Sequence, residues 1–180
     1  MWITRLEYPD LRHNERMPRF ANEYEQHQYW MKRAIALAQQ AGDAGEVPVG
    51  ALIIDDQGHC LAQAENQRER LKDPTAHAEI LALRQAGQQQ QNWHLTHCTL
   101  YVTLEPCPMC AGAILQSRLS HLVYGADDPK TGAVRTVINL PDHPVSFHHL
   151  QVQGGICEAA CQQQLRDWFR ARRQTQKQGK

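Results

Sequence analysis

The sequence has no hydrophobic run long enough to span a lipid bilayer, and its first residues lack the apolar segment of a secretory signal peptide. It has no internal repeat and no surplus of charge, because 19 Lys and Arg residues balance 19 Asp and Glu residues. Its six cysteines are too few and too irregularly spaced for a disulfide framework. These absences argue against membrane-spanning, repeat and disulfide-stapled proteins. They predict a cytoplasmic protein whose thiols stay reduced.

The chain of 180 residues is long enough for one domain with a buried core. Apolar residues recur at helical spacing from about residue 23 to 41, and Gly42 predicts the helix end. Apolar runs at 47–54 and 60–66 flank a turn segment and predict a β-hairpin. The other expected elements are a helix that opens at Asp73-Pro74-Thr75 and runs to about 86, a strand at 99–103, a helix at 108–117, strands at 121–124 and 150–153, and a C-terminal helix from 156.

Strands that alternate with helices predict an α/β fold, here a three-layer α/β/α sandwich around five strands. The opening hairpin should make the central sheet mixed rather than all parallel. The glutamine-rich run at 88–91 is expected to be a linker between elements. Residues 1–22 show no clear period and predict a partly disordered N-terminal extension, whereas residues 23–180 predict one catalytic domain that ends in a basic helix.

Two short motifs indicate the chemistry: His77-Ala78-Glu79 and Pro106-Cys107-Pro108-Met109-Cys110. One imidazole and two thiolates suit Zn²⁺, and three protein ligands leave a fourth position for water. Zinc lowers the pKa of such a water to near ~7, and Glu79 can carry its proton to a substrate nitrogen. This pattern is typical of zinc-dependent nucleobase deaminases. The sequence therefore predicts one zinc ion per chain, held by His77, Cys107 and Cys110, and no organic cofactor.

Other interpretations of the same residues remain open at this point. A lone C-x-x-C pair also occurs in dithiol redox sites and in structural zinc modules, although a structural module would need a fourth ligand such as Cys98. Glu79 could be an ordinary exposed helix residue. Asn66 follows the predicted hairpin and is either a turn residue or a polar group beside the substrate pocket.

The C-terminal segment is basic although the whole chain is neutral. From Arg166 to Lys180, six basic residues stand against the single acidic residue Asp167. Such a run is either a solvated tail or a surface that attracts phosphates. If the segment is an amphipathic helix, Trp168 and Phe169 should be buried and the arginines should face solvent.

Longer segments resemble the bacterial tRNA-specific adenosine deaminases. The resemblance covers roughly residues 27 to 175 and is carried by Glu46-Val47-Pro48-Val49-Gly50, by residues 73–80 and 105–113, by Ser117-Arg118-Leu119, by residues 124–133, and by Phe169-Arg170-Ala171-Arg172-Arg173. It implies the cytidine deaminase-like fold and a homodimer. It also implies conversion of adenosine to inosine at the wobble position of a tRNA anticodon stem-loop, in an arginine tRNA.

Carried over residue by residue, the resemblance implies that His77, Cys107 and Cys110 hold zinc and that Glu79 is the proton carrier. Asn66 matches the asparagine that contacts the bound nucleoside. The residues implied in RNA binding are Asp128, Lys130, Phe169, Arg172 and Arg173. Guanine deaminases and other free-base or nucleotide deaminases share the short motifs, so a small-molecule deaminase is the alternative function. The basic helix and the segment 125–133 favour RNA.

Overall fold

The five strands form one sheet in the order β2-β1-β3-β4-β5. The computed structural model describes residues 18–178, so most of the predicted extension at 1–22 lies outside the described residues. Strand β1 (Gly50–Ile54) pairs antiparallel with both β2 (Cys60–Glu65) and β3 (Thr99–Leu104). Strands β3, β4 (His121–Ala126) and β5 (Gln151–Gln153) run parallel. The mixed five-stranded sheet is therefore confirmed.

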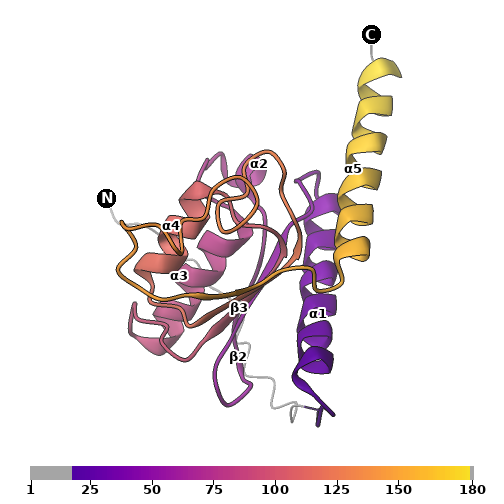
Figure 1. The fold of residues 1–180 in the computed structure, drawn as a ribbon. Helices are drawn as coiled ribbons and strands as arrows, with labels where there is room; N and C mark the ends of the chain where they lie inside the picture. Colours follow the sequence, from indigo (N-terminus) through magenta and orange to yellow (C-terminus); the bar gives the residue numbers. More distant parts are fainter. Residues whose placement is uncertain (1–17, 179–180) are drawn as a thin grey trace.

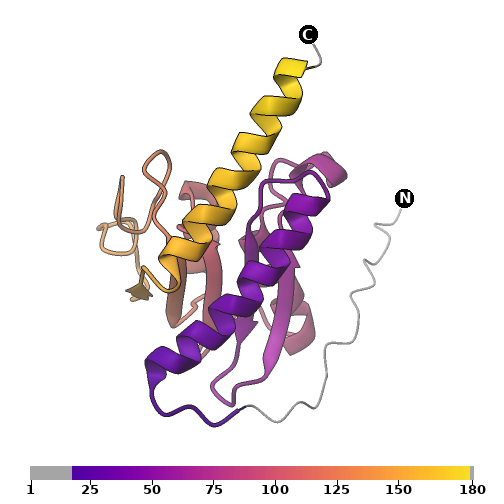
Figure 2. The same ribbon diagram turned by 90° about the vertical axis from the view of Figure 1, so that its right-hand side faces the viewer.

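The helices cover both faces of this sheet, which confirms the three-layer α/β/α sandwich (Figures 1 and 2). Helices α1 (Glu23–Asp43) and α5 (Glu158–Gln178) lie on one face, and α3 (Ala78–Gln90) and α4 (Pro108–Gln116) lie on the other. Successive residues of β3 point to opposite faces, so Tyr101 packs in the core below α1 and Leu100 in the core below α3. The last turns of α5 project beyond the rest of the domain.

Close backbone approach fixes helix α1 on the sheet. A Cβ atom at Gly50 would lie 2.2 Å from the carbonyl oxygen of Ala34 and 2.6 Å from the amide nitrogen of Ala38. Because only glycine lacks that atom, α1 can lie directly on β1. None of the helices within residues 18–178 is long and apolar enough to cross a bilayer.

The structure corrects the sequence prediction around α3. Asp73-Pro74-Thr75 does not open the helix; it forms a turn in which Asp73 Oδ1 accepts hydrogen bonds from the amide and the hydroxyl of Thr75. The helix begins at Ala78. It continues through Gln90, so most of the glutamine-rich run is helical and is not a linker. A four-residue helix, α2 (Arg68–Leu71), was not predicted.

We predict that His27 makes folding stability depend on pH. This side chain is 7% exposed, and its Nδ1 lies 2.9 Å from the hydroxyl of Tyr101. Burial lowers the pKa of His27 below its ordinary value of 6.5, and Glu23 only partly opposes the shift. The unfolded chain therefore binds this proton at a higher pH than the folded protein does. The contribution of His27 to stability is complete above about pH 6.5 and is lost as the pH falls toward the folded pKa.

Thermal unfolding of the wild type and of His27→Gln, followed from pH 7.5 to pH 5, measures this effect. The wild-type Tm should fall more steeply than that of the variant below pH 6.5. Parallel curves for the two proteins would contradict the prediction.

Candidate active site

The candidate metal ligands stand at the starts of two helices on the same side of the sheet. His77 is the N-cap of α3, and Cys107 is the N-cap of α4 with Pro108 at the first helical position. Cys110 lies in the first turn of α4 and is buried. The structure thus brings together side chains that are 30 and 33 residues apart. Unpaired amides at helix starts favour thiolate over thiol.

The separations between these three ligand atoms suit a tetrahedral metal ion. The Nδ1 atom of His77 lies 3.7 Å from Cys107 Sγ and 3.5 Å from Cys110 Sγ, and all three ligand atoms lie within 4.8 Å of one another. Zinc–sulfur and zinc–nitrogen bonds of roughly 2.3 and 2.1 Å at a tetrahedral angle place nitrogen and sulfur about 3.6 Å apart. The donor set and its spacing therefore fit zinc. In residues 18–178 the group comprises these three side chains, and Cys98 is not a member.

The pKa values of the Cys107 and Cys110 thiols are shifted in opposite directions. Hydrogen bonding from the Cys110 thiol and from His77 lowers the pKa of Cys107 to about 4. Hydrogen bonding to Cys107, together with burial, raises the pKa of Cys110. These contacts favour the thiolate form of Cys107, and a bound metal ion would displace the proton from Cys110.

Glu79 lies beside this group and is buried, so it is not an exposed helix residue. Its side chain is 4% exposed in the first turn of α3. Burial raises the pKa of the Glu79 carboxyl, although a backbone hydrogen bond and the nearby His77 oppose the shift. A carboxyl whose pKa is moved toward neutrality can both accept and release a proton, which is the property of a general acid–base group.

A cavity of about 130 Å³ opens over His77, Glu79 and Cys107. One wall comes from the chain between β2 and α3, including Asn66 and Arg68. The loop after β4 contributes Asp128 and Thr131, and the remaining lining residues are Val47, Val49, Ala78, Leu104 and Glu105. Asn66 is 5% exposed, and its side-chain amide donates to Val47 O at 3.3 Å. Asn66 is therefore ordered at the cavity and is more than a surface turn residue.

A buried carboxylate shapes the loop after β4. Glu105 Oε1 accepts hydrogen bonds from the amides of Val134, Arg135 and Thr136, and Oε2 accepts one from the amide of Asp128. Burial opposes the charged form, but these hydrogen bonds outweigh it and lower the pKa of Glu105. Both oxygens are occupied, so Glu105 organises the loop and cannot carry protons to a ligand.

A second cavity of about 170 Å³ adjoins the first, and Val47, Asn66 and Arg68 line both. Helix α5 closes the second cavity with Trp168, Phe169 and Arg172. The indole nitrogen of Trp168 donates to Gly42 O at 3.2 Å, and Arg172 donates to Gly45 O at 3.3 Å. The Arg172 guanidinium also lies 5.1 Å from the centroid of the Trp168 ring. The cationic end of α5 is therefore tied to the end of α1.

Comparison with known proteins places the chain among deaminases. The MafB19-like deaminase family model matches residues 25–173. The tRNA-specific adenosine deaminase of Haemophilus influenzae is 46% identical over 147 residues, which are 82% of this chain and 85% of that relative. The chain belongs to the tRNA-specific adenosine deaminase family.

Solved structures agree with this family. A tRNA:A34 deaminase, studied for A-to-I editing at the wobble position of transfer RNA, has a TM-score of 0.73 and 40% identity over 76% of this chain and 98% of that one. A guanine deaminase from Bacillus subtilis has a TM-score of 0.54 and 32% identity over 67% of this chain and 87% of that one. The tRNA-specific adenosine deaminases are thus nearer in both sequence and fold, and the cytidine deaminase-like fold is confirmed.

The RNA-binding residues expected from the deaminase resemblance are not all placed together. Asp128 lines the first cavity, and its carboxylate accepts hydrogen bonds from the amide of Lys130 and the hydroxyl of Thr131. Phe169 is 42% exposed and is not buried as expected for an amphipathic helix, whereas Trp168 is partly buried. Lys130 and Arg173 are exposed and line neither cavity.

Sequence reasoning missed three residues next to the deaminase site: Glu46, Arg68 and Glu105. Arg68 lines both cavities, while the two glutamates are 1% and 2% exposed. A glutamate in a sequence is usually exposed, and no spacing rule showed that these two side chains accept hydrogen bonds from backbone amides far along the chain.

We predict that the purified deaminase binds one metal ion per chain and that Cys107→Ser reduces this to well below one. The reason is that serine replaces a thiolate ligand with a hydroxyl group. Elemental analysis after gel filtration measures the stoichiometry. Cys98→Ser is the matched control, because Cys98 is a buried free cysteine outside the ligand group and its loss should leave the metal content unchanged. Equal metal content in both variants would exclude Cys107 as a ligand.

Proposed function

We propose that the protein is a zinc-dependent hydrolase that converts adenosine to inosine at the wobble position of a tRNA anticodon, in an arginine tRNA. The observation that carries this proposal is the buried carboxylate of Glu79 beside a three-ligand group at the base of a cavity. A structural zinc module has no use for such a carboxylate. The relatives named for tRNA adenosine deamination supply the substrate class.

His77, Cys107 and Cys110 would hold the zinc ion as one imidazole and two thiolates. When bound by three protein ligands, zinc keeps one position open and makes a water acidic near pH 7. The helix starts at Ala78 and Pro108 direct unpaired amides toward the same region and favour negative charge there.

Glu79 performs the proton transfers in the proposed reaction. Its carboxylate takes a proton from water as the water oxygen adds to C6 of the purine, and gives that proton to N1. It then moves the second proton of the same oxygen to the amino nitrogen, which leaves as ammonia when the bond to C6 breaks. Water and adenosine are consumed, and inosine and ammonia are formed. Burial of Glu79 keeps this carboxyl out of bulk solvent during both transfers.

The size of the first cavity suits one base of a longer substrate. Its volume of about 130 Å³ is below the roughly 300–1,000 Å³ of pockets that enclose a complete drug-sized ligand. An unpaired anticodon-loop adenosine can be splayed into such a site without melting a duplex. Arg68, at the shared wall of both cavities, would face the sugar–phosphate backbone that leads to the next nucleotide.

Asn66 would contact the nucleoside, and Asp128, Lys130, Phe169, Arg172 and Arg173 would contact the RNA around it. We also propose that the enzyme is a homodimer in the cytoplasm, where its six free cysteines would stay reduced. Guanine deamination is the second candidate function, because the guanine deaminase fold is similar. The aromatic and cationic lining of the second cavity favours the RNA substrate.

Replacing Glu79 by Gln should reduce kcat by at least ~10²-fold, because it removes the proton carrier and no metal ligand. Inosine formed in an anticodon stem-loop RNA, measured under single-turnover conditions, tests this. Zinc content and Tm serve as the controls and should match those of the wild type. Retention of most of the activity would show that Glu79 does not carry the protons.

Salt dependence separates the RNA substrate from a free base. Phosphate contacts release counterions, so KM for single-stranded RNA should rise with salt at a log–log slope near ~0.7 per neutralised phosphate. Arg68→Ala should raise KM and reduce the slope by roughly that amount, with kcat at saturating RNA little changed. A KM that is insensitive to salt, together with efficient release of ammonia from guanine, would favour the free-base function.

A further inference from the structure

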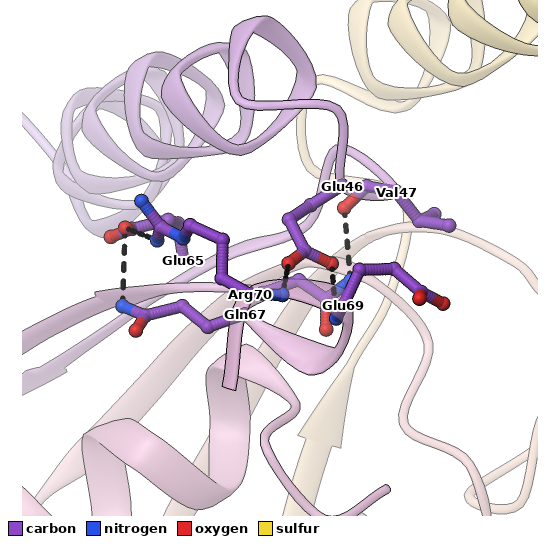
Figure 3. Close-up of polar contacts among 7 residues, drawn as sticks. Glu46, Val47, Glu65, Gln67, Glu69 and Arg70 are labelled. Carbon is purple, nitrogen blue, oxygen red and sulfur yellow. Dashed lines mark hydrogen bonds and ion pairs between the residues drawn. The ribbon is translucent and has the colours of Figure 1, made fainter. Parts of the chain in front are cut away.

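A buried carboxylate that takes no part in the proposed chemistry lines the second cavity. Glu46 is 1% exposed and stands between the end of α1 and the start of β1. Its Oε2 accepts a hydrogen bond from the amide of Glu69 at 3.0 Å, and Oε1 accepts one from the amide of Arg70 at 2.7 Å (Figure 3). Burial of a carboxylate is costly unless its oxygens are hydrogen-bonded. These two hydrogen bonds offset the free-energy cost of burying the Glu46 carboxylate.

The two amides belong to the first turn of α2. The first amides of a helix have no partner within the helix, and the local N-cap residue, Gln67, makes no side-chain capping hydrogen bond. A carboxylate is a strong acceptor here, because the amides carry partial positive charge. Glu46 therefore supplies the missing cap from a position 23 residues before Glu69.

The segment held in this way carries the wall that the two cavities share. Asn66 precedes α2 and is joined to the same stretch of chain as Glu46: its amide donates to Val49 O at 2.9 Å and its side chain to Val47 O at 3.3 Å. Arg68 is the first residue of α2. A shift of α2 would move Arg68 and Asn66 relative to His77 and Glu79, which belong to a different helix.

Polar contacts on the outer side of the segment are weaker anchors. Glu65 Oε1 accepts hydrogen bonds from Arg70 Nη2 at 2.6 Å and from Gln67 Nε2 at 3.1 Å (Figure 3). The Arg70 side chain in this ion pair is 45% exposed. Exposed ion pairs of this kind contribute little, because water and salt screen them and long side chains lose entropy. The buried Glu46 is thus the anchor, and Glu65 offers a matched control.

We propose that Glu46 is a positioning residue, whose buried carboxylate caps α2 and so fixes Asn66 and Arg68 in the wall shared by both cavities. Glutamine cannot replace it fully, because its amide group would present a donor to one of the two N–H groups. Aspartate keeps both acceptors, but its side chain is one methylene shorter. Amide protection and RNA affinity are therefore expected to fall more in Glu46→Gln than in Glu46→Asp. Glu65→Gln should behave like the wild type.

Amide hydrogen exchange, measured by NMR on the zinc-loaded full chain, tests the geometric part without any substrate. In Glu46→Gln at least one of the two amides, of Glu69 or Arg70, should exchange about tenfold faster than in the wild type, because glutamine keeps only one of the two acceptor oxygens. Glu65→Gln should leave both rates unchanged. Equal protection of these amides in Glu46→Gln and in the wild type would overturn the proposal.

Kinetic measurements test the consequence for the site. This test rests on the proposed function, because it uses the proposed RNA substrate. With an anticodon stem-loop RNA, Glu46→Gln should raise KM about tenfold and lower kcat less, at unchanged zinc content, and Glu46→Asp should recover part of the loss. If Glu46→Gln lowers both kcat and Tm but leaves KM unchanged, Glu46 contributes to folding alone and the positioning role is refuted. If the wild type does not deaminate this RNA, the proposed function fails, and the exchange rates still decide the role of Glu46.

Discussion

Two helices that start side by side determine what this protein can do. The sheet places the starts of α3 and α4 on the same side of the molecule, so that one N-cap residue is His77 and the other is Cys107. Their ligand atoms meet at 3.7 Å although no strand or helix contains both. The unpaired amides of both helix starts favour anionic groups, so thiolate ligands and the developing charge of the proposed reaction would share one electrostatic environment. The first cavity opens over these helix starts, and the second cavity adjoins the first.

Three buried glutamates line the two cavities, and their surroundings differ. Glu46 and Glu105 accept hydrogen bonds from backbone amides at both oxygens, so each holds one segment of the cavity wall. For Glu79 burial is the dominant influence and raises its pKa. The same type of side chain can therefore be a fixed anchor where backbone amides occupy both oxygens, and the proposed proton carrier where burial dominates.

The sequence predicts the metal site better than its surroundings. Ligand chemistry restricts the choice to His77, Cys107 and Cys110, and the alternation of strands and helices predicts the sandwich, because both rest on local spacing. The start of α3 was misplaced because Asp73 and Pro74 are typical of a helix start as well as of a turn, and the hydrogen bonds to Thr75 decide for the turn. The cavity walls depend on contacts between distant segments, such as Glu46 with Arg70, which no local pattern contains.

Residues from near the beginning and the end of the domain line the second cavity together. Trp168 packs on Gly42, where a Cβ atom would lie 3.3 Å from the indole ring, and Arg172 reaches Gly45. The candidate metal ligands, in contrast, all lie between residues 77 and 110. During synthesis on the ribosome, the ligand set is therefore complete long before the last helix can dock. A nascent chain, or one cut before Trp168, can carry every residue of the proposed chemistry and still lack one wall of the surface proposed to hold RNA.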